Sequence, residues 1–399
     1  MKIFVLTPTF LPVMGGAEIG IHELCRRLGK RHDVRVLTPR LPRDLTQAYG
    51  VENGEFDTPG YEVTRYADRL NLKNAPGQGL LRGLIPPFSL SLARHALRQA
   101  RSLRPDVVLA FYALPCGLAA ARIRKKLRVP VVLSLIGRDV PGPAVPRFWG
   151  AYVRWSMGAA NRTLFISEYC RQALGVGQGP AADVIPFGVD CERFAPGAAA
   201  GPLRERLGIP REAKVLLALQ RLDPWKQVQV LIQAQALLLQ QTDAYLVIGG
   251  KGPELESLRG LARDLGIASR ILFTGYIPDK ELPLYYALAD VFACHSTYET
   301  FGLSLLQAMA AGMPVVSVSS TAIPELIRHG ENGFLVPPRD AAAFARAALK
   351  LLADGELRKR FAAESRRRAL ADYGWESVAR RYELALETCV AEQAGENSP

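Results

Sequence analysis

The sequence predicts an α/β protein made of two doubly wound domains. Two observations lead to this fold class. Short apolar runs typical of strands alternate with amphipathic helical stretches, which is the pattern of βαβ units around a parallel sheet. The chain also has 399 residues, more than one hydrophobic core normally accommodates, so two domains are expected.

The first domain is expected over residues 1–193. A helix is predicted at 18–28 and another beginning near Ser89. Buried strands are predicted by continuous apolar runs at 3–6, 34–37, 107–110, 131–135 and 163–166. The segment 194–202 is rich in Pro, Gly and Ala and has no periodic apolar pattern, so we interpret it as an interdomain linker.

The second domain is expected over residues 203–374 and repeats the same alternation. Helices are predicted at 228–239 and 254–265. Strands are predicted at 215–219, 244–248, 271–273 and 291–294. Two such domains facing each other would form a cleft at the carboxyl ends of their strands, where open α/β sheets bind ligands. A last helix is expected from Trp375 to about residue 390, with no strand after it.

Composition limits the class of protein. An apolar fraction of 49% and a charged fraction of 22% indicate a globular chain. The six cysteines are scattered without a C-x-x-C pair, which argues against a zinc site or a disulfide framework and fits a reducing cytoplasm. The first apolar run is too short for a signal peptide, and no apolar stretch is long enough to cross a bilayer. We therefore expect a cytoplasmic protein.

The net charge of +12 is confined to the first half of the chain. Residues 1–200 hold 27 Lys and Arg against 15 Asp and Glu, whereas residues 201–399 hold 23 of each kind. A basic half can attract a nucleic acid, an anionic membrane surface or a phosphorylated substrate. The candidate strip on the helix near Ser89 comprises Arg82, Arg94, His95, Arg98, Arg101 and Arg104. Aromatic residues do not interleave with this strip, which disfavours a nucleic-acid partner. Two alternatives stay open, a solvated helix face and a peripheral contact with the inner membrane.

Two glycine-containing turns precede predicted helices. Glu299 comes just before a Phe301-Gly302 turn that opens an apolar-faced helix, so the N–H groups of Gly302 and Leu303 would favour phosphate oxygens. Gly15-Gly16 lies between the first strand and its helix and would let phosphate approach the backbone. The alternative for Glu299 is a first-turn acid that only complements the helix dipole. The alternative for Gly15-Gly16 is an ordinary βα turn.

Arg221 and Lys226 follow the first predicted strand of the second domain. Arg can hold two phosphate oxygens and Lys adds a compact charge, so the pair could stabilise a departing diphosphate. The alternative is two exposed loop cations. The chain has no Asp-x-Asp, the usual carboxylate pair for a Mg²⁺ or Mn²⁺ clamp. We therefore expect no metal and no cofactor.

These motifs resemble the retaining glycosyltransferases of family 4, the glycosyl transferases group 1, whose GT-B fold has two Rossmann-like domains facing a cleft. The segment from Glu299 to Gln307 is similar to the E-x7-E region of the family. Gly15 to Glu18 is similar to its Gly-Gly-Ala-Glu loop. Arg221 to Lys226 is similar to its G-R-L-x-x-x-K-G motif, although glutamines replace both glycines. Five weaker motifs follow in family order, at 185–190, 250–253, 273–277, 323–325 and 330–336.

The resemblance implies a set of site residues. Arg221 and Lys226 would neutralise the leaving diphosphate, and Glu299 would contact the sugar hydroxyls. The implied substrate-binding residues are Gly15, Gly16, Gly137, Asp139, Gly250, Tyr276, Ile277, Phe301, Gly302, Leu303 and Gln307. It also implies that the terminal segment 375–399 forms a helix, with a tail, that crosses back to the first domain.

Two departures from the family pattern concern recognition. Ile136 stands where the family has the histidine of H-G-x-D, and an aliphatic side chain cannot hydrogen-bond a sugar hydroxyl. Gln307 stands where the second Glu contacts the donor ribose. A hydrogen bond to a charged group is worth about 1.5–3 kcal/mol against about 1 kcal/mol for a neutral one. We expect weaker donor binding as a result.

The expected function is a retaining hexosyltransferase that uses a nucleotide-diphosphate sugar. Its acceptor would be a lipid-linked, phosphorylated or saccharide hydroxyl, in synthesis of an envelope polysaccharide or glycolipid. The alternative is a degenerate GT-B protein that binds nucleotide sugars or serves as a scaffold. A GT-B epimerase or phosphorylase is a third reading, although we find neither a pyridoxal-phosphate lysine nor an inorganic phosphate site in the sequence. The residues leave the donor base and sugar open.

Overall fold

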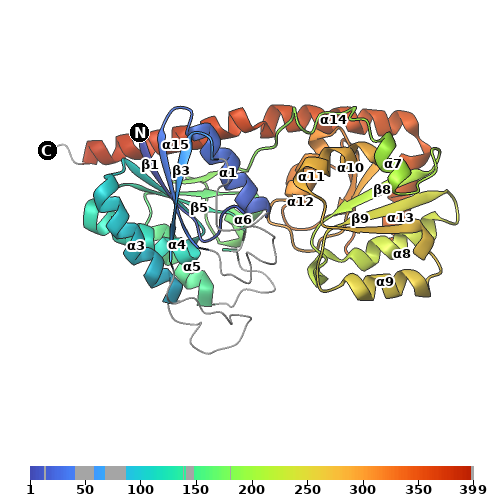
Figure 1. Ribbon diagram of the computed structural model, residues 1–399, viewed down its shortest axis with the longest axis horizontal. Coiled ribbons are helices and arrows are strands. Elements are labelled where there is room, and N and C mark those ends of the chain that lie inside the picture. Colours follow the sequence, from blue (N-terminus) through green and yellow to red (C-terminus); the bar gives the residue numbers. More distant parts are fainter. Residues whose placement is uncertain are drawn as a thin grey trace. The chain divides into compact units, whose positions relative to one another are not determined.

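The computed structural model describes residues 1–12, 15–40, 58–67, 87–137, 139–140, 148–179 and 181–396. The chain divides into two compact units (Figure 1). Unit 1 comprises Met1–Gly188 together with Trp375–Pro399, and unit 2 comprises Val189–Gly374. Arg82, which the sequence analysis placed in a basic strip, lies outside the described residues.

The change from unit 1 to unit 2 comes earlier in the chain than the expected linker. Segment 194–202 belongs to unit 2. Phe194 is buried there, and its ring meets Tyr286 edge-on with centroids 5.6 Å apart. Composition suggested a linker because Pro, Gly and Ala surround Phe194, but one buried aromatic side chain is enough to fix the segment to a domain.

Unit 1 is built on a seven-stranded sheet with the order β3-β2-β1-β4-β5-β6-β7. All pairings between these strands are parallel. The central strands are buried along their whole length because helices cover both faces, as their unbroken apolar runs predicted. The strands are β1 (Lys2–Leu6), β2 (Asp33–Pro39), β3 (Tyr61–Tyr66), β4 (Val107–Phe111), β5 (Val131–Leu135), β6 (Arg162–Phe165) and β7 (Ala182–Val184).

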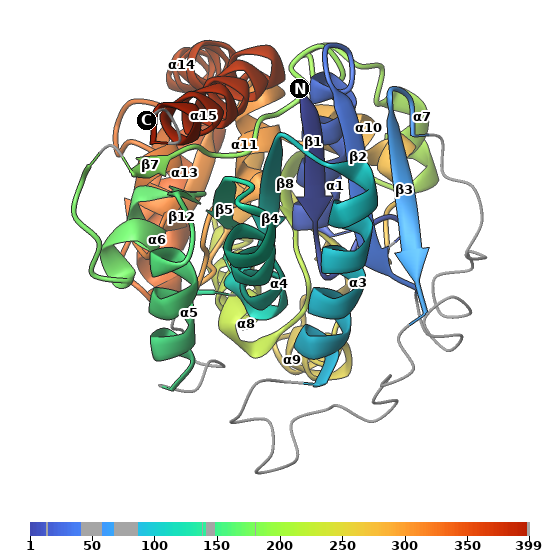
Figure 2. The same cartoon turned by 90° about the vertical axis from the view of Figure 1, so that its left-hand side faces the viewer.

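The helices of unit 1 form two layers. The helix α4 packs between α3 and α5, and Figure 2 shows these three side by side. The terminal helix α15 contacts α1 and strands β4 and β5. The helices are α1 (Gly16–Leu28), α3 (Pro87–Leu103), α4 (Ala113–Leu127), α5 (Phe148–Gly158), α6 (Glu168–Ala173) and α15 (Trp375–Glu396).

Unit 2 is built on a six-stranded sheet with the order β10-β9-β8-β11-β12-β13, again with parallel pairings throughout. The predicted α/β fold class is therefore confirmed in both units. The strands are β8 (Lys214–Leu219), β9 (Ala244–Gly249), β10 (Ile271–Gly275), β11 (Val291–Cys294), β12 (Val315–Val318) and β13 (Gly333–Val336).

The core of unit 2 lies between its sheet and the helices α8, α9 and α13, whose apolar side chains pack on those of the strands. Capping carboxylates define two helix starts, because Asp340 accepts from Ala343 N at 2.8 Å and Asp354 from Leu357 N at 2.9 Å. The longer helices are α8 (Val228–Leu238), α9 (Leu255–Asp264), α11 (Leu303–Ala310), α13 (Ala341–Ala353) and α14 (Gly355–Tyr373). The shorter ones are α7 (Gly201–Arg206), η2 (Pro224–Lys226), η3 (Ala268–Arg270), η4 (Asp279–Glu281), α10 (Leu282–Leu288) and α12 (Ile323–Leu326).

Candidate functional site

Most of the expected donor residues lie on loops at one edge of the unit 2 sheet. Lys226 follows β8, Gly250 follows β9, Tyr276 follows β10 and Glu299 follows β11. These four strands are neighbours in the sheet and all run parallel, so their carboxyl ends meet at the same edge. The strand order reverses between β8 and β11, and open α/β sheets bind ligands at such a switch point.

Lys226 and Glu299 meet at that switch point. The Nζ of Lys226 lies 2.5 Å from the Oε2 of Glu299, and the two side chains are only 16% and 19% exposed. Burial alone would lower the pKa of Lys226, but the charge of Glu299 and its hydrogen bond outweigh this effect, so the pKa lies above its ordinary value. Lys226 therefore supplies a permanent positive charge beside a carboxylate.

Backbone and hydroxyl contacts hold the two loops in place. Thr297 donates to the carbonyl oxygen of Trp225 from its backbone N at 2.9 Å and from its Oγ1 at 3.1 Å, which joins the Glu299 loop to the Lys226 turn. Glu299 N donates to Thr321 Oγ1 at 2.9 Å. These threonines are not among the residues expected from the sequence, because nothing in their spacing indicates a contact across the sheet edge.

Arg221 reaches further into solvent than Lys226. Its side chain is 72% exposed. Its Nε and Nη2 donate to the carboxylate of Asp223 at 2.9 and 3.2 Å. Asp223 itself is buried and therefore serves as a fixed support for the guanidinium group. Asp223 is not among the residues expected from the sequence, although its place two residues after Arg221 was a usable signal.

The start of α11 has the conformation expected of a phosphate-facing turn. Gly302 is the N-cap residue with φ 95°, a left-handed conformation that favours glycine, and no side chain caps the helix. A Cβ at this position would lie 2.9 Å from Leu305 Cδ1. Phe301 before it is buried, with its ring tilted against Tyr373. Gly302 therefore offers no capping side chain to the first N–H groups of α11, which begin with Leu303.

Gly250 and the residues after β10 have structural roles of their own. Gly250 has φ 131°, and a Cβ there would lie 1.9 Å from Gln220 O, so only glycine fits. Its N donates to Gly275 O at 2.7 Å. Ile277 is buried, whereas the Tyr276 side chain is 52% exposed at the same edge. Of the two substrate-binding residues that the resemblance implies here, Tyr276 therefore presents an exposed ring and Ile277 does not.

Gln307 is oriented by a buried tyrosine. The hydroxyl of Tyr286 lies 2.9 Å from Gln307 Oε1 and 3.1 Å from Ser304 O. Both Tyr286 and Gln307 are buried. Hydrogen bonding therefore fixes the amide that replaces the family's second Glu. The sequence does not indicate this contact, because Tyr286 and Gln307 are 21 residues apart.

In unit 1, the Gly15-Gly16 turn and the Gly137 loop both follow strands of the central sheet. Gly15 is the N-cap residue of α1, and a Cβ on it would lie 2.3 Å from Glu18 Oε2, so glycine makes room for that carboxylate. Gly16 is the first residue of α1. Glu18 is buried and also accepts a hydrogen bond from Thr9 Oγ1.

Asp139 is a buried carboxylate in the loop after β5. Its Oδ1 accepts from Ala113 N, at the start of α4, at 2.7 Å. Its Oδ2 has no hydrogen-bond partner in the described part of the protein. Burial raises the pKa of Asp139 to about 7, despite the opposing backbone hydrogen bonds. Gly137 (φ 134°) and the buried Ile136 precede it.

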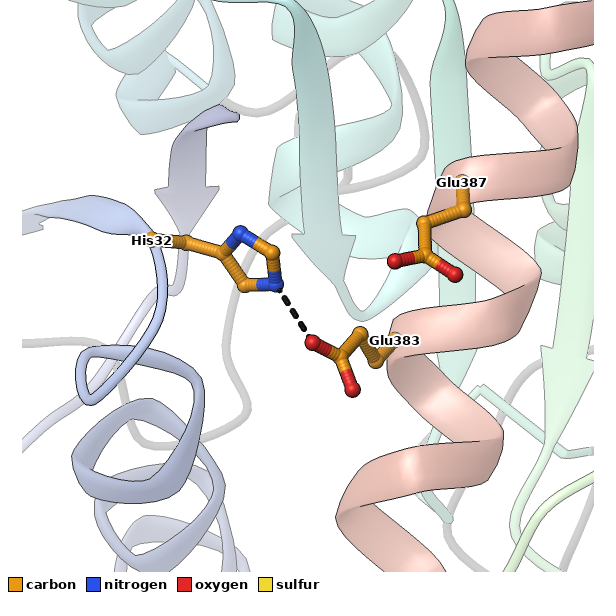
Figure 3. Close-up of side chains that lie close together, drawn as sticks. All are labelled: His32, Glu383 and Glu387. Carbon is orange, nitrogen blue, oxygen red and sulfur yellow. Dashed lines mark hydrogen bonds and ion pairs between the residues drawn. The ribbon is translucent and has the colours of Figure 1, made fainter.

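Within the described ranges, one group of side chains is close enough to share a metal ion: His32, Glu383 and Glu387 (Figure 3). His32 Nε2 lies 2.8 Å from Glu383 Oε1. Arg31 and Arg380 donate to the other oxygen of Glu383 at 2.9 and 2.7 Å. Two guanidinium groups already neutralise this carboxylate, so the cluster is better explained as the ion-paired attachment of α15. His32 also precedes β2, at the amino edge of the sheet, away from the loops that carry Gly15 and Asp139.

Two family models match most of the chain. The family model "Glycosyltransferase Family 4" matches residues 14–193, and "Glycosyl transferases group 1" matches residues 201–368. A GDP-mannose-dependent alpha-(1-6)-phosphatidylinositol monomannoside mannosyltransferase of Mycobacterium tuberculosis is 32% identical over 395 residues, which cover 95% of this chain and 96% of the relative. The chain belongs to glycosyltransferase family 4.

Solved structures share the fold of this family 4 glycosyltransferase. Sucrose-phosphate synthase from Thermosynechococcus elongatus superposes with a TM-score of 0.82 at 22% identity, covering 98% of this chain and 99% of that one. Anabaena Alr3699/HepE in complex with UDP and glucose gives a TM-score of 0.76 at 22% identity, covering 97% and 100%. The expected GT-B fold is confirmed. As a family member, the chain is a glycosyltransferase with a nucleotide-sugar donor.

Proposed function

We propose that this family 4 glycosyltransferase is a retaining, metal-independent hexosyltransferase that transfers a hexose from a nucleotide-diphosphate sugar to an acceptor hydroxyl. The Lys226–Glu299 pair is the observation that carries the proposal. The Nζ of Lys226, a permanent cation that could bind a diphosphate, lies 2.5 Å from the Oε2 of Glu299, a carboxylate that could accept from sugar hydroxyls. The uncapped start of α11 follows three residues after Glu299 and adds backbone donors for phosphate.

The proposed reaction needs no side chain as a general base. The bond between the anomeric carbon and the diphosphate oxygen breaks, and Lys226 and Arg221 stabilise the charge that develops on the leaving group. The acceptor oxygen bonds to the anomeric carbon on the same face. Its proton passes to the departing phosphate oxygen. Atoms and charge balance without a metal, and the configuration of the sugar is retained.

We extend the proposal to substrates from the relatives. The M. tuberculosis relative is named for GDP-mannose and a phosphatidylinositol mannoside. This supports a lipid-linked, phosphorylated acceptor and a role in envelope glycolipid or polysaccharide synthesis, with the enzyme at the inner membrane face. A saturation-transfer NMR screen over UDP, GDP and ADP sugars would identify the donor. Preference for a free saccharide over every lipid-linked acceptor would contradict the proposed acceptor class.

The test of the reaction is the variant pair Lys226→Ala and Glu299→Ala. Each should lower turnover at least about a hundredfold, because each removes a charged contact with the reacting donor. Chelation with EDTA should leave turnover unchanged. Lys359→Ala is a matched control, since Lys359 is an exposed cation on α14 that pairs with Glu356. Circular dichroism would establish that each variant is folded, and unchanged turnover in both site variants would refute the assignment.

Glu299→Gln separates the two roles at this site. It keeps the size of the side chain but removes the charge that now neutralises Lys226. Nucleoside diphosphate should then bind at least as tightly as to the wild type, while sugar transfer is lost. Weaker diphosphate binding would show that Glu299 does not act on the sugar alone.

A nucleotide-sugar-binding protein without transfer activity is the second candidate. The observations that favour it are Ile136, which is buried and aliphatic, and Gln307, whose amide oxygen is bonded to Tyr286. Calorimetry that detects nucleotide-sugar binding, together with no product from any acceptor pool, would support this candidate over the transferase.

A further inference from the structure

Three neighbouring helices of unit 1 contain no carboxylate. Helices α3, α4 and α5 have eight Lys and Arg residues and no Asp or Glu. The cations are Arg94, Arg98, Arg101, Arg122, Arg124, Lys125, Lys126 and Arg154. Since α4 packs on both α3 and α5 (Figure 2), these charges belong to one layer of the unit.

The cations of this layer are directed to solvent and lack acidic partners. All are exposed except Arg124, which is half-buried and donates to Ala159 O at 3.2 Å. Arg98 lies 3.1 Å from a ring nitrogen of His95. In the described part of the chain, none of the eight forms a salt bridge. Their positive potential is therefore not cancelled locally.

Basic helices elsewhere in the protein are arranged differently. On α14, Lys359 pairs with Glu356 at 2.9 Å and Arg367 with Glu364 at 2.7 Å. On α15, Arg380 pairs with Glu383 at 2.7 Å. These are the usual pairs of a solvated helix face. The layer α3-α4-α5 departs from that pattern, because its cations have no Asp or Glu on the same three helices to pair with.

Aromatic side chains form a row along α5. Trp149, Tyr152 and Trp155 follow at intervals of three residues, with ring centroids 6.3 and 5.5 Å apart. Trp155 is 48% exposed. The buried side of α5 carries Ser156, which packs on Gly117 of α4, where a Cβ would lie 2.3 Å from Ser156 Oγ. The helix is thus fixed with part of its aromatic row in solvent.

An exposed apolar residue also extends the basic stripe of α3. Leu90 is 42% exposed and lies four residues before Arg94. Arg98 and Arg101 continue the stripe at helical spacing. Exposed Leu and Trp side chains beside unpaired cations combine the two chemistries that bind a lipid headgroup region, where Trp and Tyr lie at the interface and cations contact anionic headgroups.

We propose that the layer α3-α4-α5 is the docking surface of this protein for an anionic lipid bilayer. Each cation near such a surface adds to the attraction, and no carboxylate of the three helices opposes it. Trp155 and Leu90 insert among the headgroups. This proposal rests on the proposed function, because a lipid-linked acceptor would be held at a membrane surface.

The test is co-sedimentation of the full chain with phosphatidylcholine vesicles, with and without phosphatidylglycerol. The wild type should bind only the anionic vesicles and should release at high salt. The triple variant Arg94→Gln, Arg98→Gln, Arg101→Gln should bind about a hundredfold more weakly. Trp155→Ala should bind several-fold more weakly.

Matched controls separate a local surface from net charge and general exposure. Lys359→Gln, Arg360→Gln, Arg367→Gln removes the same charge from α14 and should leave vesicle binding unchanged. Leu370→Ala removes another apolar side chain, 51% exposed, and should also have no effect. Equal loss of binding in the α3 and α14 triple variants would overturn the proposal.

Two further measurements complete the test. Tighter binding of single-stranded nucleic acid than of anionic vesicles, at one salt concentration, would overturn the proposal in favour of a nucleic-acid surface. Nucleotide binding by each variant would establish that it is folded. Vesicle binding requires no sugar transfer, so a chain that binds vesicles but transfers no sugar would refute the proposed function and leave the docking surface standing.

Discussion

At the scale of single residues, Gln307 gives the most direct test of donor recognition. Its amide oxygen is held at 2.9 Å from the Tyr286 hydroxyl. A glutamate at this position could accept from Tyr286 with one oxygen and from a ribose hydroxyl with the other. Because a charged acceptor is worth about 1 kcal/mol more than a neutral one, Gln307→Glu should tighten donor binding about fivefold in calorimetry.

Two variants serve as controls for that measurement. Gln307→Leu removes all hydrogen bonding at the position and should weaken donor binding. Tyr286→Phe removes only the hydroxyl that holds the Gln307 amide. Any change in donor binding in this variant would come from the greater freedom of the Gln307 side chain. Donor binding that is the same in the Glu, Leu and wild-type proteins would mean that residue 307 does not reach the nucleotide.

Asp139 predicts a pH dependence of stability. Burial raises its pKa to about 7 in the folded state, whereas an unfolded aspartate titrates near 3.8. The folded protein therefore binds more protons between these values, so the stability that the protonated side chain contributes is full below about pH 4 and is lost as the pH rises to 7. Asp139→Asn should flatten this dependence and raise the unfolding free energy at pH 8 by at least about 1 kcal/mol.

The measurement is urea unfolding of both proteins at several pH values. The asparagine can still accept from Ala113 N, so the start of α4 keeps its hydrogen bond. Asp33→Asn, at an exposed carboxylate that pairs with Arg35, is the control for the loss of one carboxylate. An equal slope in the wild type and Asp139→Asn would show that Asp139 is ionised throughout.

Sequence patterns located single site residues better than they located their partners. Lys226 was expected on the loop after a strand and Glu299 just before the turn that opens a helix, and the structure brings the two side chains into contact. Tyr286 and Asp223 were not expected, since Tyr286 looks like an ordinary core aromatic and Asp223 like a turn residue. The contact of Tyr286 with Gln307 joins side chains that are 21 residues apart, and that of Asp223 with Arg221 depends on a local bend of the chain.

At the scale of secondary structure, the turn before α11 is the element that the donor site depends on most. Gly302 adopts φ 95°, and an added Cβ would press on Leu305. Gly302→Ala should lower the unfolding free energy by about 2–3 kcal/mol and weaken donor binding, because it combines backbone strain with overpacking. Thermal unfolding and calorimetry would measure the two effects.

Gly266 provides the matched control for that substitution. It has φ 68°, and no atom lies within 4 Å of a Cβ placed there. Gly266→Ala should therefore cost only the backbone strain of about 1–2 kcal/mol and should leave donor binding intact. If Gly302→Ala bound donor normally, the α11 turn would not be part of the site.

Elements with continuous apolar runs were predicted to within a residue or two, as for β11 at Val291–Cys294. The edge strand β3 at Tyr61–Tyr66 was missed. Among the described residues it pairs only with β2, and its YEVTRY sequence mixes charged residues with apolar ones in a half-buried pattern. Edge strands lack the apolar signature of central strands because one side faces solvent.

At the scale of the whole molecule, the charge asymmetry of the sequence has a structural counterpart. The excess of Lys and Arg falls within residues 1–200. The layer α3-α4-α5 contributes eight of these cations and no Asp or Glu. The sequence predicted a basic first half but assigned it to one helix. Only the packing of α4 between α3 and α5 shows that separate segments contribute to one layer.

The division into two units leads to a prediction for donor binding measured by hydrogen exchange. Nucleoside diphosphate at about a hundred times its Kd should slow exchange of directly contacted amides about a hundredfold. We expect this protection in unit 2 at residues 221–227 and 299–304, since the cations and the uncapped start of α11 are there. In unit 1, helices α3, α4 and α5 should exchange as before. Lys226→Ala should abolish the protection at 299–304, whereas protection spread evenly over unit 1 would contradict a donor site carried by unit 2.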